Sequence, residues 1–243
     1  MKRKKTDPQS CLIETPPEGI LLLNKAKGVS SFSYVPKLRK LLNIKKIGHA
    51  GTLDPLATGL LILLIGKSYT KQAATFLQCT KEYTATFFLG KSTTTYDAEG
   101  SVTKESPLIP QQEEIDRALS HFQGDLEQTP PMFSAKKVQG KKLYELARKN
   151  IQIDLKPCKI HLQTTLLSYN YPYLHLKVHC SKGTYIRSLA HDFGQFLGTN
   201  AFLYELTRTK VGPFSLENAL SLESIDPSPE AILEHLIHET PQV

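Results

Sequence analysis

The chain contains one stretch in which three glycines and a proline surround a single acid: Gly48-His49-Ala50-Gly51-Thr52-Leu53-Asp54-Pro55-Leu56-Ala57-Thr58-Gly59. Directly after it comes the longest aliphatic run of the sequence, Leu60-Leu61-Ile62-Leu63-Leu64-Ile65. This run is far shorter than the roughly 20 apolar residues that span a bilayer, and it predicts a buried strand. Glycine permits backbone shapes closed to other residues and proline restricts its own backbone, so the stretch predicts a shaped loop that holds the Asp54 carboxylate in one orientation. The alternative, commoner for an acid in a loop, is an Asp that only caps a helix or forms a turn.

The residues on either side of this loop switch between the periods of strands and helices. Apolar and β-branched runs predict strands at 20–23, 81–89, 162–167 and 173–180, and helical spacing predicts helices at 32–42, 111–122 and 184–197. Strands and helices mixed in this order, with hairpins, are typical of an α+β fold. We therefore expect a mixed, largely antiparallel central sheet flanked by helices.

The composition is that of a globular protein, because 243 residues with 40% hydrophobic content can bury a sizeable core. Four cysteines are widely scattered without any Cys-x-x-Cys pair, so we expect reduced thiols. The basic residues 2–5 resemble the start of a signal peptide, but polar residues follow at 6–10, where an apolar segment should begin. We therefore expect a cytoplasmic protein with no membrane partner.

The net charge of +7 is distributed unevenly along the chain. Residues 214–243 contain six acids and no Lys or Arg, which leaves +13 on residues 1–213. A body this basic attracts polyanions, and the release of counterions from phosphates favours nucleic acid as a partner, although many basic proteins bind none. The densest basic segment follows Pro130-Pro131, and its cations are Lys136, Lys137, Lys141, Lys142, Arg148 and Lys149. Such a charge run is usually a solvated face.

Residues 48–59 closely resemble the signature of TruB-type pseudouridine synthases. Four more blocks agree in the family's order, and they are residues 19–25, residues 81–83 with 89–90, residues 130–148 and residues 180–187. The resemblance covers roughly residues 19–221, which is most of the chain. The sequence departs from the family at Asn24-Lys25-Ala26, where Asp-Lys-Pro is usual, and at Ala50, where Thr is usual.

The resemblance implies a pseudouridine synthase fold and an enzyme that isomerises a uridine to pseudouridine in the T-loop of tRNA, at position 55. It implies that Asp54 is the nucleophile or covalent catalyst, that Tyr83 stacks against the target base and that Arg187 pairs with Asp54. Without the motif, Tyr83 would be read as a core residue of a strand, and Arg187 as a surface or phosphate-binding arginine.

The resemblance also implies a set of residues that bind the substrate. His49 would help to occupy the space of the extruded base, and Lys25, Tyr185 and Leu206 would be further active-site residues. Residues 128–150 would form an RNA-clasping thumb, whose candidate RNA-binding lysines are Lys136, Lys137, Lys141 and Lys142.

The chemistry of the reaction supports these roles independently. Turning uridine into pseudouridine breaks one C–N bond and forms one C–C bond without redox change, hydrolysis or group donation, so no cofactor is required. The reaction needs an ionised carboxylate near a permanent cation in a desolvated pocket, a role in which arginine serves better than lysine. Because a base in folded tRNA is stacked, it must be flipped out and read by aromatic and polar groups, which Tyr83 and His49 would supply.

One group of possible metal ligands lies in a single stretch, and its members are Cys158, His161, His175, His179 and Cys180. Their spacing fits no standard zinc pattern. His175 and His179 alternate with aliphatic residues, as they would on the polar face of a half-buried strand. We therefore expect no metal site.

The expected organisation is a flexible basic arm at 1–18, a catalytic domain at 19–221 and an acidic tail at 222–243, in a monomer. Because residues 214–243 lack Lys and Arg, we expect the family's C-terminal RNA-binding domain to be absent or vestigial. One alternative is a tRNA-binding or tRNA-folding module with incidental or lost catalysis. Another is a synthase for ribosomal or guide-directed RNA, which is disfavoured because the chain is short.

Overall fold

The computed structural model describes residues 16–134, 137–138, 140–147, 149, 151, 153–221 and 228–240. These residues form short helices, one large sheet and two small two-stranded sheets, β5–β6 and β8–β9. Along the chain the elements are β1 (Gly19–Lys25), η1 (Ser31–Ser33), α1 (Tyr34–Leu42), β2 (Ile47–Ala50), β3 (Thr58–Ile65), α2 (Lys67–Thr70), α3 (Ala73–Gln78), β4 (Lys81–Leu89), β5 (Lys91–Thr93), β6 (Val102–Glu105), α4 (Gln112–His121), β7 (Gly124–Gln128), β8 (Lys137–Val138), β9 (Lys141–Lys142), α5 (Leu143–Ala147), β10 (Cys158–Asn170), β11 (Tyr173–Cys180), α6 (Ile186–Phe196), β12 (Ala201–Val211), β13 (Phe214–Ser215), η2 (Leu216–Asn218) and α7 (Pro229–Glu234). None of these helices is long and apolar enough to cross a membrane.

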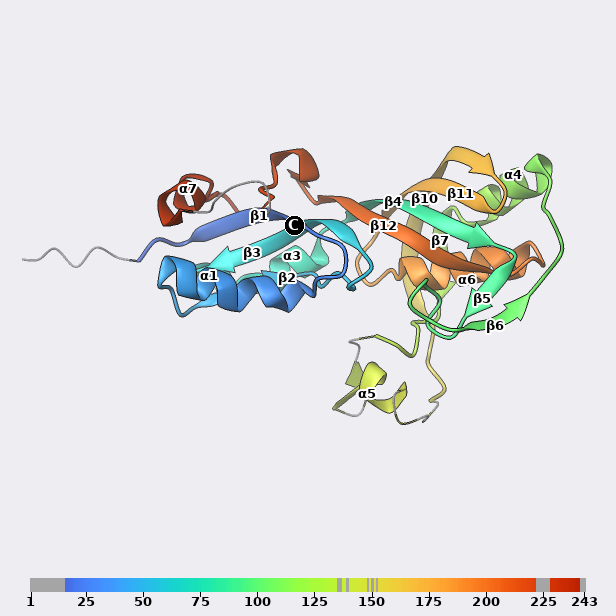
Figure 1. Ribbon diagram of the computed structural model, residues 1–243, viewed down its shortest axis with the longest axis horizontal. Coiled ribbons are helices and arrows are strands. Elements are labelled where there is room, and N and C mark those ends of the chain that lie inside the picture. Colours follow the sequence, from blue (N-terminus) through green and yellow to red (C-terminus); the bar gives the residue numbers. More distant parts are fainter. Residues whose placement is uncertain are drawn as a thin grey trace, which may run out of the picture.

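A nine-stranded sheet runs along the length of the molecule (Figure 1). Its main path has the order β1-β3-β12-β4-β11-β10-β7, while β2 pairs with β3 and β13 pairs with β12. The strand pairs within it are antiparallel, apart from the parallel pair β3–β12. The predicted α+β fold with a mixed, largely antiparallel sheet is therefore confirmed.

The parallel pair joins the two ends of the molecule. It is short, with Thr58 opposite Thr207 and Gly59 opposite Arg208. One end holds β1, β2, β3, α1 and α7, the other holds β10, β11, α4 and α6, and a small lobe with α5 projects from between them (Figure 1). The loop that carries Asp54 ends where these two halves meet.

The aliphatic run of β3 is continuous because helices cover both faces of this strand. Leu61, Leu63 and Ile65 pack in a cluster with residues of α1, and Leu60, Ile62 and Leu64 pack in a second cluster with Phe76 of α3. A strand buried on both faces has no polar side, so its sequence does not alternate.

The strands at the other end alternate because only one of their faces meets the core. In β11, Leu174, Leu176 and Val178 are fully buried beside α6, while Lys177 between them is exposed. His175 lies on the same outward face as Lys177, and its Nδ1 lies 3.0 Å from Oγ1 of Thr86. The interpretation of His175 as a residue of the polar strand face agrees with this contact.

The predicted elements are found with shifts at their ends, but several elements were missed, among them β12 in the middle of the sheet and β2 in the predicted loop. The stretch 48–59 was predicted as a loop throughout, whereas its first three residues belong to β2, which pairs with β3 from Ile47 opposite Ile65 to Ala50 opposite Ile62. This is a correction to the prediction. Apart from Ile47, the strand Ile-Gly-His-Ala lacks the β-branched and aromatic residues that mark strands in a sequence.

The segments at the two termini touch the same end of the sheet. Residues 1–15 lie outside the described part of the chain, and Glu18 accepts a hydrogen bond from the backbone N of Lys67 at 2.7 Å. Near the C-terminus Ile232 of α7 is 2% exposed, and Ile237 pairs with Ile20 of β1. The division into arm, catalytic domain and tail stays a prediction, and the described residues 228–240 pack on β1.

Candidate active site

Asp54 and Arg187 come from opposite halves of the molecule and meet at their junction. Asp54 lies in the loop between β2 and β3, and Arg187 lies in the first turn of α6. Nε of Arg187 is 2.9 Å from Oδ2 of Asp54, and the side chain of Asp54 is 46% exposed whereas that of Arg187 is 8% exposed. The acid therefore faces open space with a buried cation behind it.

Arg187 is held in place by four groups. Besides Asp54, its Nε lies 3.6 Å from Oδ2 of Asp97, whose side chain is 5% exposed. Its Nη2 donates to the carbonyl of Phe133 at 2.8 Å, and its Nη1 donates to the carbonyl of Thr95 at 3.3 Å. Only a guanidinium has donors in the fork that this arrangement requires.

The Asp54 loop is fastened on the side of β1 by short polar contacts. Ser31 Oγ lies 2.9 Å from both the N and the O of Leu53. The Nζ of Lys25 donates to the carbonyls of Val29 at 2.7 Å and Pro55 at 3.3 Å, and Lys25 is fully buried. Burial lowers the pKa of Lys25 to about 8, while the charge of Asp54 acts in the opposite direction.

Arg208 fastens the same loop from β12. Its Nε donates to the carbonyl of Leu60 at 2.7 Å and its Nη2 to the carbonyl of Gly51 at 2.8 Å, and it is 2% exposed. Gly59, with φ of +97°, lies against its backbone, and a Cβ there would be 2.4 Å from the carbonyl oxygen of Arg208. Only glycine allows this approach, which sets the position of the loop relative to β12.

A small pocket of about 200 Å³ opens beside Asp54. Its lining includes the predicted site residues Asp54, Tyr83, Tyr185, Arg187 and Leu206. Burial raises the pKa of Tyr83, while the hydrogen bond and charge of Arg208 oppose that shift, so the neutral phenol is favoured. The side chain of Gln128 holds the backbone of Tyr185. The N of Tyr185 donates to Oε1 of Gln128 at 2.8 Å, and Nε2 of Gln128 donates to the carbonyl of Tyr185 at 3.1 Å.

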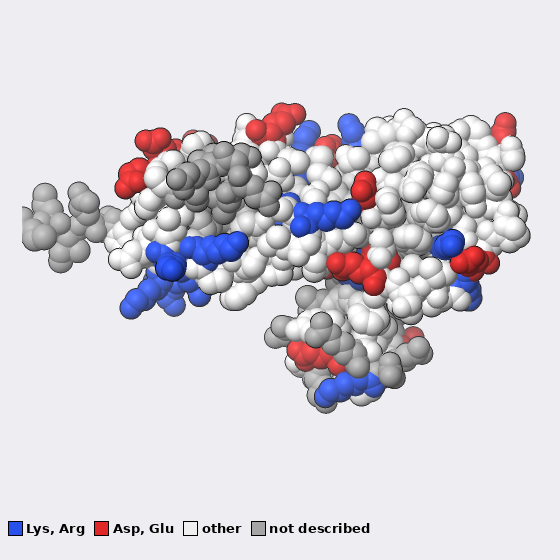
Figure 2. All heavy atoms as spheres, viewed as in Figure 1, with Lys and Arg blue, Asp and Glu red and all other residues white. Residues whose placement is uncertain are grey.

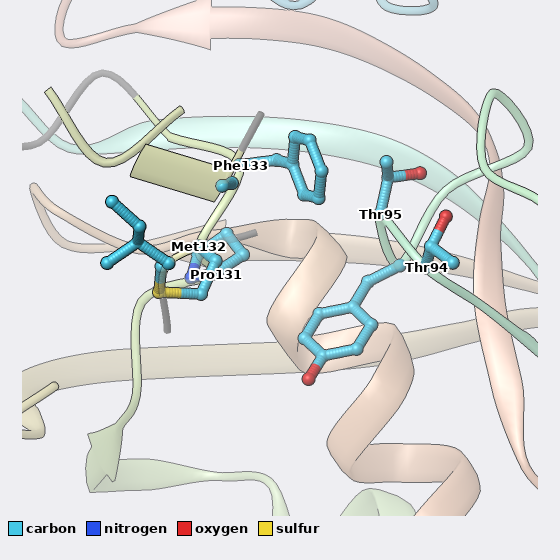
Figure 3. Close-up of a pocket in the computed structure, with 8 residues that line it drawn as sticks. Thr94, Thr95, Pro131, Met132 and Phe133 are labelled. Atoms are coloured by element: carbon cyan, nitrogen blue, oxygen red, sulfur yellow. The ribbon is translucent and has the colours of Figure 1, made fainter. Parts of the chain in front are cut away.

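A larger cavity of about 540 Å³ lies next to this pocket, between the body and the base of the predicted thumb. Figure 3 shows the ring of Phe133 extending toward Thr95 across it, with Met132 on the side of Phe133 and Thr94 on the side of Thr95. Because the carbonyls of Thr95 and Phe133 both bind Arg187, this cavity and the Asp54 pocket share a wall.

Those of the remaining predicted site residues that the structure describes do not line the pocket. His49 is on β2 and does not line it; burial, followed by the charge of Arg208, lowers the pKa of His49. Lys136 lies outside the described residues, while Lys137, Lys141 and Lys142 belong to the backbone of the β8–β9 hairpin. Their contacts with RNA stay predictions.

Two residues that hold the site together, Asp97 and Arg208, were not predicted from the sequence. Asp97 lies in the stretch Thr94-Thr95-Tyr96-Asp97 after β5, where an acid among threonines predicts no more than a turn. Arg208 is a single arginine in a strand, and nothing local distinguishes it from an exposed one. Both became recognisable only through the residues that they contact.

Comparison with protein families and known proteins identifies relatives of most of the chain. Residues 39–186 match the model of the TruB family pseudouridylate synthase (N-terminal domain), and residues 187–238 match the tRNA pseudouridylate synthase B C-terminal domain. A tRNA pseudouridine synthase B of Protochlamydia amoebophila is 58% identical over 212 residues, which are 86% of this chain and 81% of that protein. One of Chlamydia muridarum is 46% identical over 225 residues, 93% of each chain.

Solved structures have the same fold. A chain of a Cbf5-Nop10-Gar1 complex is 26% identical with a TM-score of 0.65, and the match covers 89% of this chain and 62% of that one. A chain of an H/ACA RNP bound to a substrate RNA containing 2'-deoxyuridine is 26% identical with a TM-score of 0.61, covering 84% of this chain and 51% of that one. This chain thus spans about half to two thirds of the length of those two. Since the family models match residues 39–238 in succession and the relative at 58% identity is covered over four fifths of its length, the chain belongs to the TruB family of pseudouridylate synthases.

Proposed function

We propose that this chain isomerises uridine to pseudouridine at position 55 in the T-loop of tRNA, with Asp54 as the catalytic carboxylate. The observation that carries the proposal is the Arg187–Asp54 contact of 2.9 Å at the edge of a small pocket. The class of reaction, isomerisation of uridine to pseudouridine, is supported by membership of the TruB family and by the name of both relatives, tRNA pseudouridine synthase B.

The reaction breaks the N1–C1′ bond of the nucleotide and forms a C5–C1′ bond. One proton leaves C5 and one is gained at N1, so the base leaves and returns without any other reactant. The Asp54 carboxylate can add either to C1′ of the sugar or to C6 of the base, because a carboxylate is a nucleophile and the guanidinium of Arg187 holds it at 2.9 Å. Both routes use the same residues.

The pocket walls suit a flipped uracil. The ring of Tyr83 supplies an aromatic face, and Tyr185 and Leu206 complete an apolar rim against which a base can stack. The lowered pKa of His49 favours a neutral imidazole, which suits a ring that fills the space of the extruded base. The thumb, 128–150, would close over the RNA through its lysines.

The proposal includes no organic cofactor and no metal, because the isomerisation has no redox or hydrolytic step. It places the enzyme in the cytoplasm as a monomer, since a folded tRNA is its substrate and one chain supplies Asp54, Tyr83 and Arg187.

The test is to map pseudouridine in tRNA after incubation with the wild-type protein or with Asp54→Asn. Asn keeps the shape of Asp and cannot act as the nucleophile, so product at position 55 should fall by several orders of magnitude, while tRNA binding and folding persist. If Asp54 only ordered its loop, activity should fall about tenfold, which corresponds to about 1.4 kcal/mol. Near-normal turnover, with mass spectrometry excluding deamidation to Asp, would sink the mechanism.

A further inference from the structure

Tyr96 has a backbone conformation that a tyrosine rarely adopts. Its φ is +63°, in the left-handed region that favours glycine, so the residue is strained. Core packing does not compensate for this strain, because Tyr96 is only partly buried and lines both the cavity of about 540 Å³ and a neighbouring cavity of about 400 Å³. A strained residue persists where its surroundings hold it, so the contacts of Tyr96 explain its position.

The ring of Tyr96 lies flat against the imidazole of His191 in α6. The two ring centroids are 4.0 Å apart, and the ring planes are inclined by 12°. Burial, followed by the charge of Lys104, lowers the pKa of His191, so its neutral ring is favoured. Its Nδ1 is buried and hydrogen-bonds to no residue in the described part of the chain. Stacking, rather than a hydrogen bond from Nδ1, therefore places this ring.

The stack lies next to the residues that hold Arg187. His191 follows Arg187 by four residues in α6, so the two side chains project from the same face of the helix. Tyr96 lies between Thr95 and Asp97. The carbonyl of Thr95 is 3.3 Å from Nη1 of Arg187, and Oδ2 of Asp97 is 3.6 Å from its Nε.

The carboxylate of Asp97 is oriented from within this turn, residues 94–97. Its Oδ1 accepts hydrogen bonds from Oγ1 of Thr95 at 2.5 Å and from the backbone N of Glu99 at 3.1 Å. These bonds leave Oδ2 to face Arg187. The position of the turn therefore sets the position of the carboxylate.

The turn is tied to the body on two sides. The N of Leu203 in β12 donates to the carbonyl of Tyr96 at 2.9 Å, and the carbonyl of Leu203 accepts from the N of Ala98 at 3.0 Å. The stack on His191 ties the turn to α6. Loss of the Tyr96 ring would keep the bonds to β12 and remove this contact with α6.

Arg187 depends on a fixed turn because several acids compete for it. Acidic side chains gather where the lobe with α5 joins the body (Figure 2). The Nε of Arg187 is 2.9 Å from Oδ2 of Asp54 and 3.6 Å from Oδ2 of Asp97. Burial, followed by the charges of Asp97 and Asp54, raises the pKa of Glu99. A small shift of the turn would therefore change which carboxylate Arg187 faces.

We propose that Tyr96 and His191 are a positioning pair for the isomerisation. Their stack holds the turn against α6, and the turn in its place keeps the guanidinium of Arg187 beside Asp54. The inference rests on the proposed function, because the pair acts on the reaction assigned there.

The test is a double-mutant cycle in the full chain. Tyr96→Leu and His191→Leu each remove one ring, the double variant removes both, and Tyr96→Phe keeps the stack. The control is His121→Leu. His121 of α4 also stacks on a residue of α6, Phe196, with centroids 4.7 Å apart and planes inclined by 21°, but at the opposite end of the helix from Arg187.

Each single ring loss should lower kcat for pseudouridine formation in tRNA by about 10- to 100-fold with KM within about threefold, because the acid is misplaced while RNA binding is kept. The double variant should lose no more than the worse single variant, because both changes remove the same contact. Tyr96→Phe and His121→Leu should keep kcat within about twofold of wild type. If Tyr96→Leu does not fold, Tyr96→Gly replaces it, because glycine adopts a φ of +63° freely.

A second readout does not need the reaction. The Nε–H of Arg187, assigned in NMR spectra by its absence from Arg187→Lys, should exchange with solvent faster in the ring-loss variants than in the wild type and in His121→Leu, because a displaced turn no longer shields it. If the wild-type protein makes no pseudouridine in tRNA, the proposed function fails, and this measurement decides the inference.

Additive losses of kcat in the double variant would overturn the inference, as would equal losses in His121→Leu or an unchanged exchange rate of the Arg187 Nε–H. Coupling between Tyr96 and His191 in urea unfolding, with kcat unchanged, would show a pair that only stabilises the fold.

Discussion

The guanidinium of Arg187 lies with its Nε 2.9 Å from Oδ2 of Asp54, although 132 residues separate the two in the sequence. The remaining nitrogens of Arg187 bind the carbonyls of Phe133 and Thr95, one at the base of the thumb and one after β5. The position of the acid therefore depends on three segments that meet only in the folded chain.

Replacing Arg187 by Lys tests whether this fork is needed. An ammonium can pair with Asp54 but cannot also reach both carbonyls, so kcat for pseudouridine formation should fall by about 10² to 10³. KM should change much less, because Arg187 is buried behind the acid. Arg117→Lys on the exposed face of α4 is the control, and a kcat within about threefold of wild type for Arg187→Lys would contradict the role.

Replacing Arg208 by Met should damage both stability and turnover. The carbonyls of Gly51 and Leu60 lose their buried donor, which costs about 1–3 kcal/mol for each group left unsatisfied. Urea unfolding measures this loss, and kcat should also fall because the Asp54 loop is no longer held to β12. Lys210→Met, an exposed change on the same strand, should leave both quantities near the wild-type values.

Lys25 should give the protein a characteristic dependence on pH. Its pKa is lowered from 10.5 to about 8 in the folded protein, so between these values the unfolded chain binds more protons, and the free energy of unfolding rises with pH. The contribution is at most about 1.4 kcal/mol per pH unit for one proton. Urea unfolding of the wild type and of Lys25→Met at pH 8, 9 and 10 isolates it, because other groups titrate in both proteins.

The stability difference, wild type minus Lys25→Met, should grow as the pH rises through this range. Parallel stability curves for the two proteins would show that Lys25 has no lowered pKa.

The C-terminal helix should contribute to the stability of the main domain. Ile232 of α7 is 2% exposed and belongs to the cluster that also contains Leu61 and Leu63 of β3. Ile232→Ala should lower the free energy of unfolding by about 2–5 kcal/mol in a single transition. Ile109→Ala, at a residue 54% exposed, serves as the control. A separate early transition for α7, with the main transition unchanged, would be the contrary result.

Local patterns were sufficient to predict much of the fold. Strand β3 has a continuous aliphatic sequence because helices cover both of its faces, whereas β11 alternates because only one of its faces is covered. Both patterns are visible in the sequence. Strand β2 escaped prediction because Gly48, His49 and Ala50 have no strand preference, and only pairing with β3 makes them extended.

The shaped loop around the acid could be predicted from residues 48–59, because glycines permit unusual backbone shapes there and a proline fixes its own backbone. The class of chemistry came from the resemblance of these residues to the signature of TruB-type pseudouridine synthases. The surroundings of the acid could not be predicted. Asp97 acts through its contact with Arg187 of α6. Arg208 acts through contacts made across the junction of β3 and β12, where Gly59 lies against its backbone. Burial and charge pairing depend on neighbours that are distant in sequence, so a local sequence pattern cannot predict them. Only the tertiary structure shows which side chains hold Asp54.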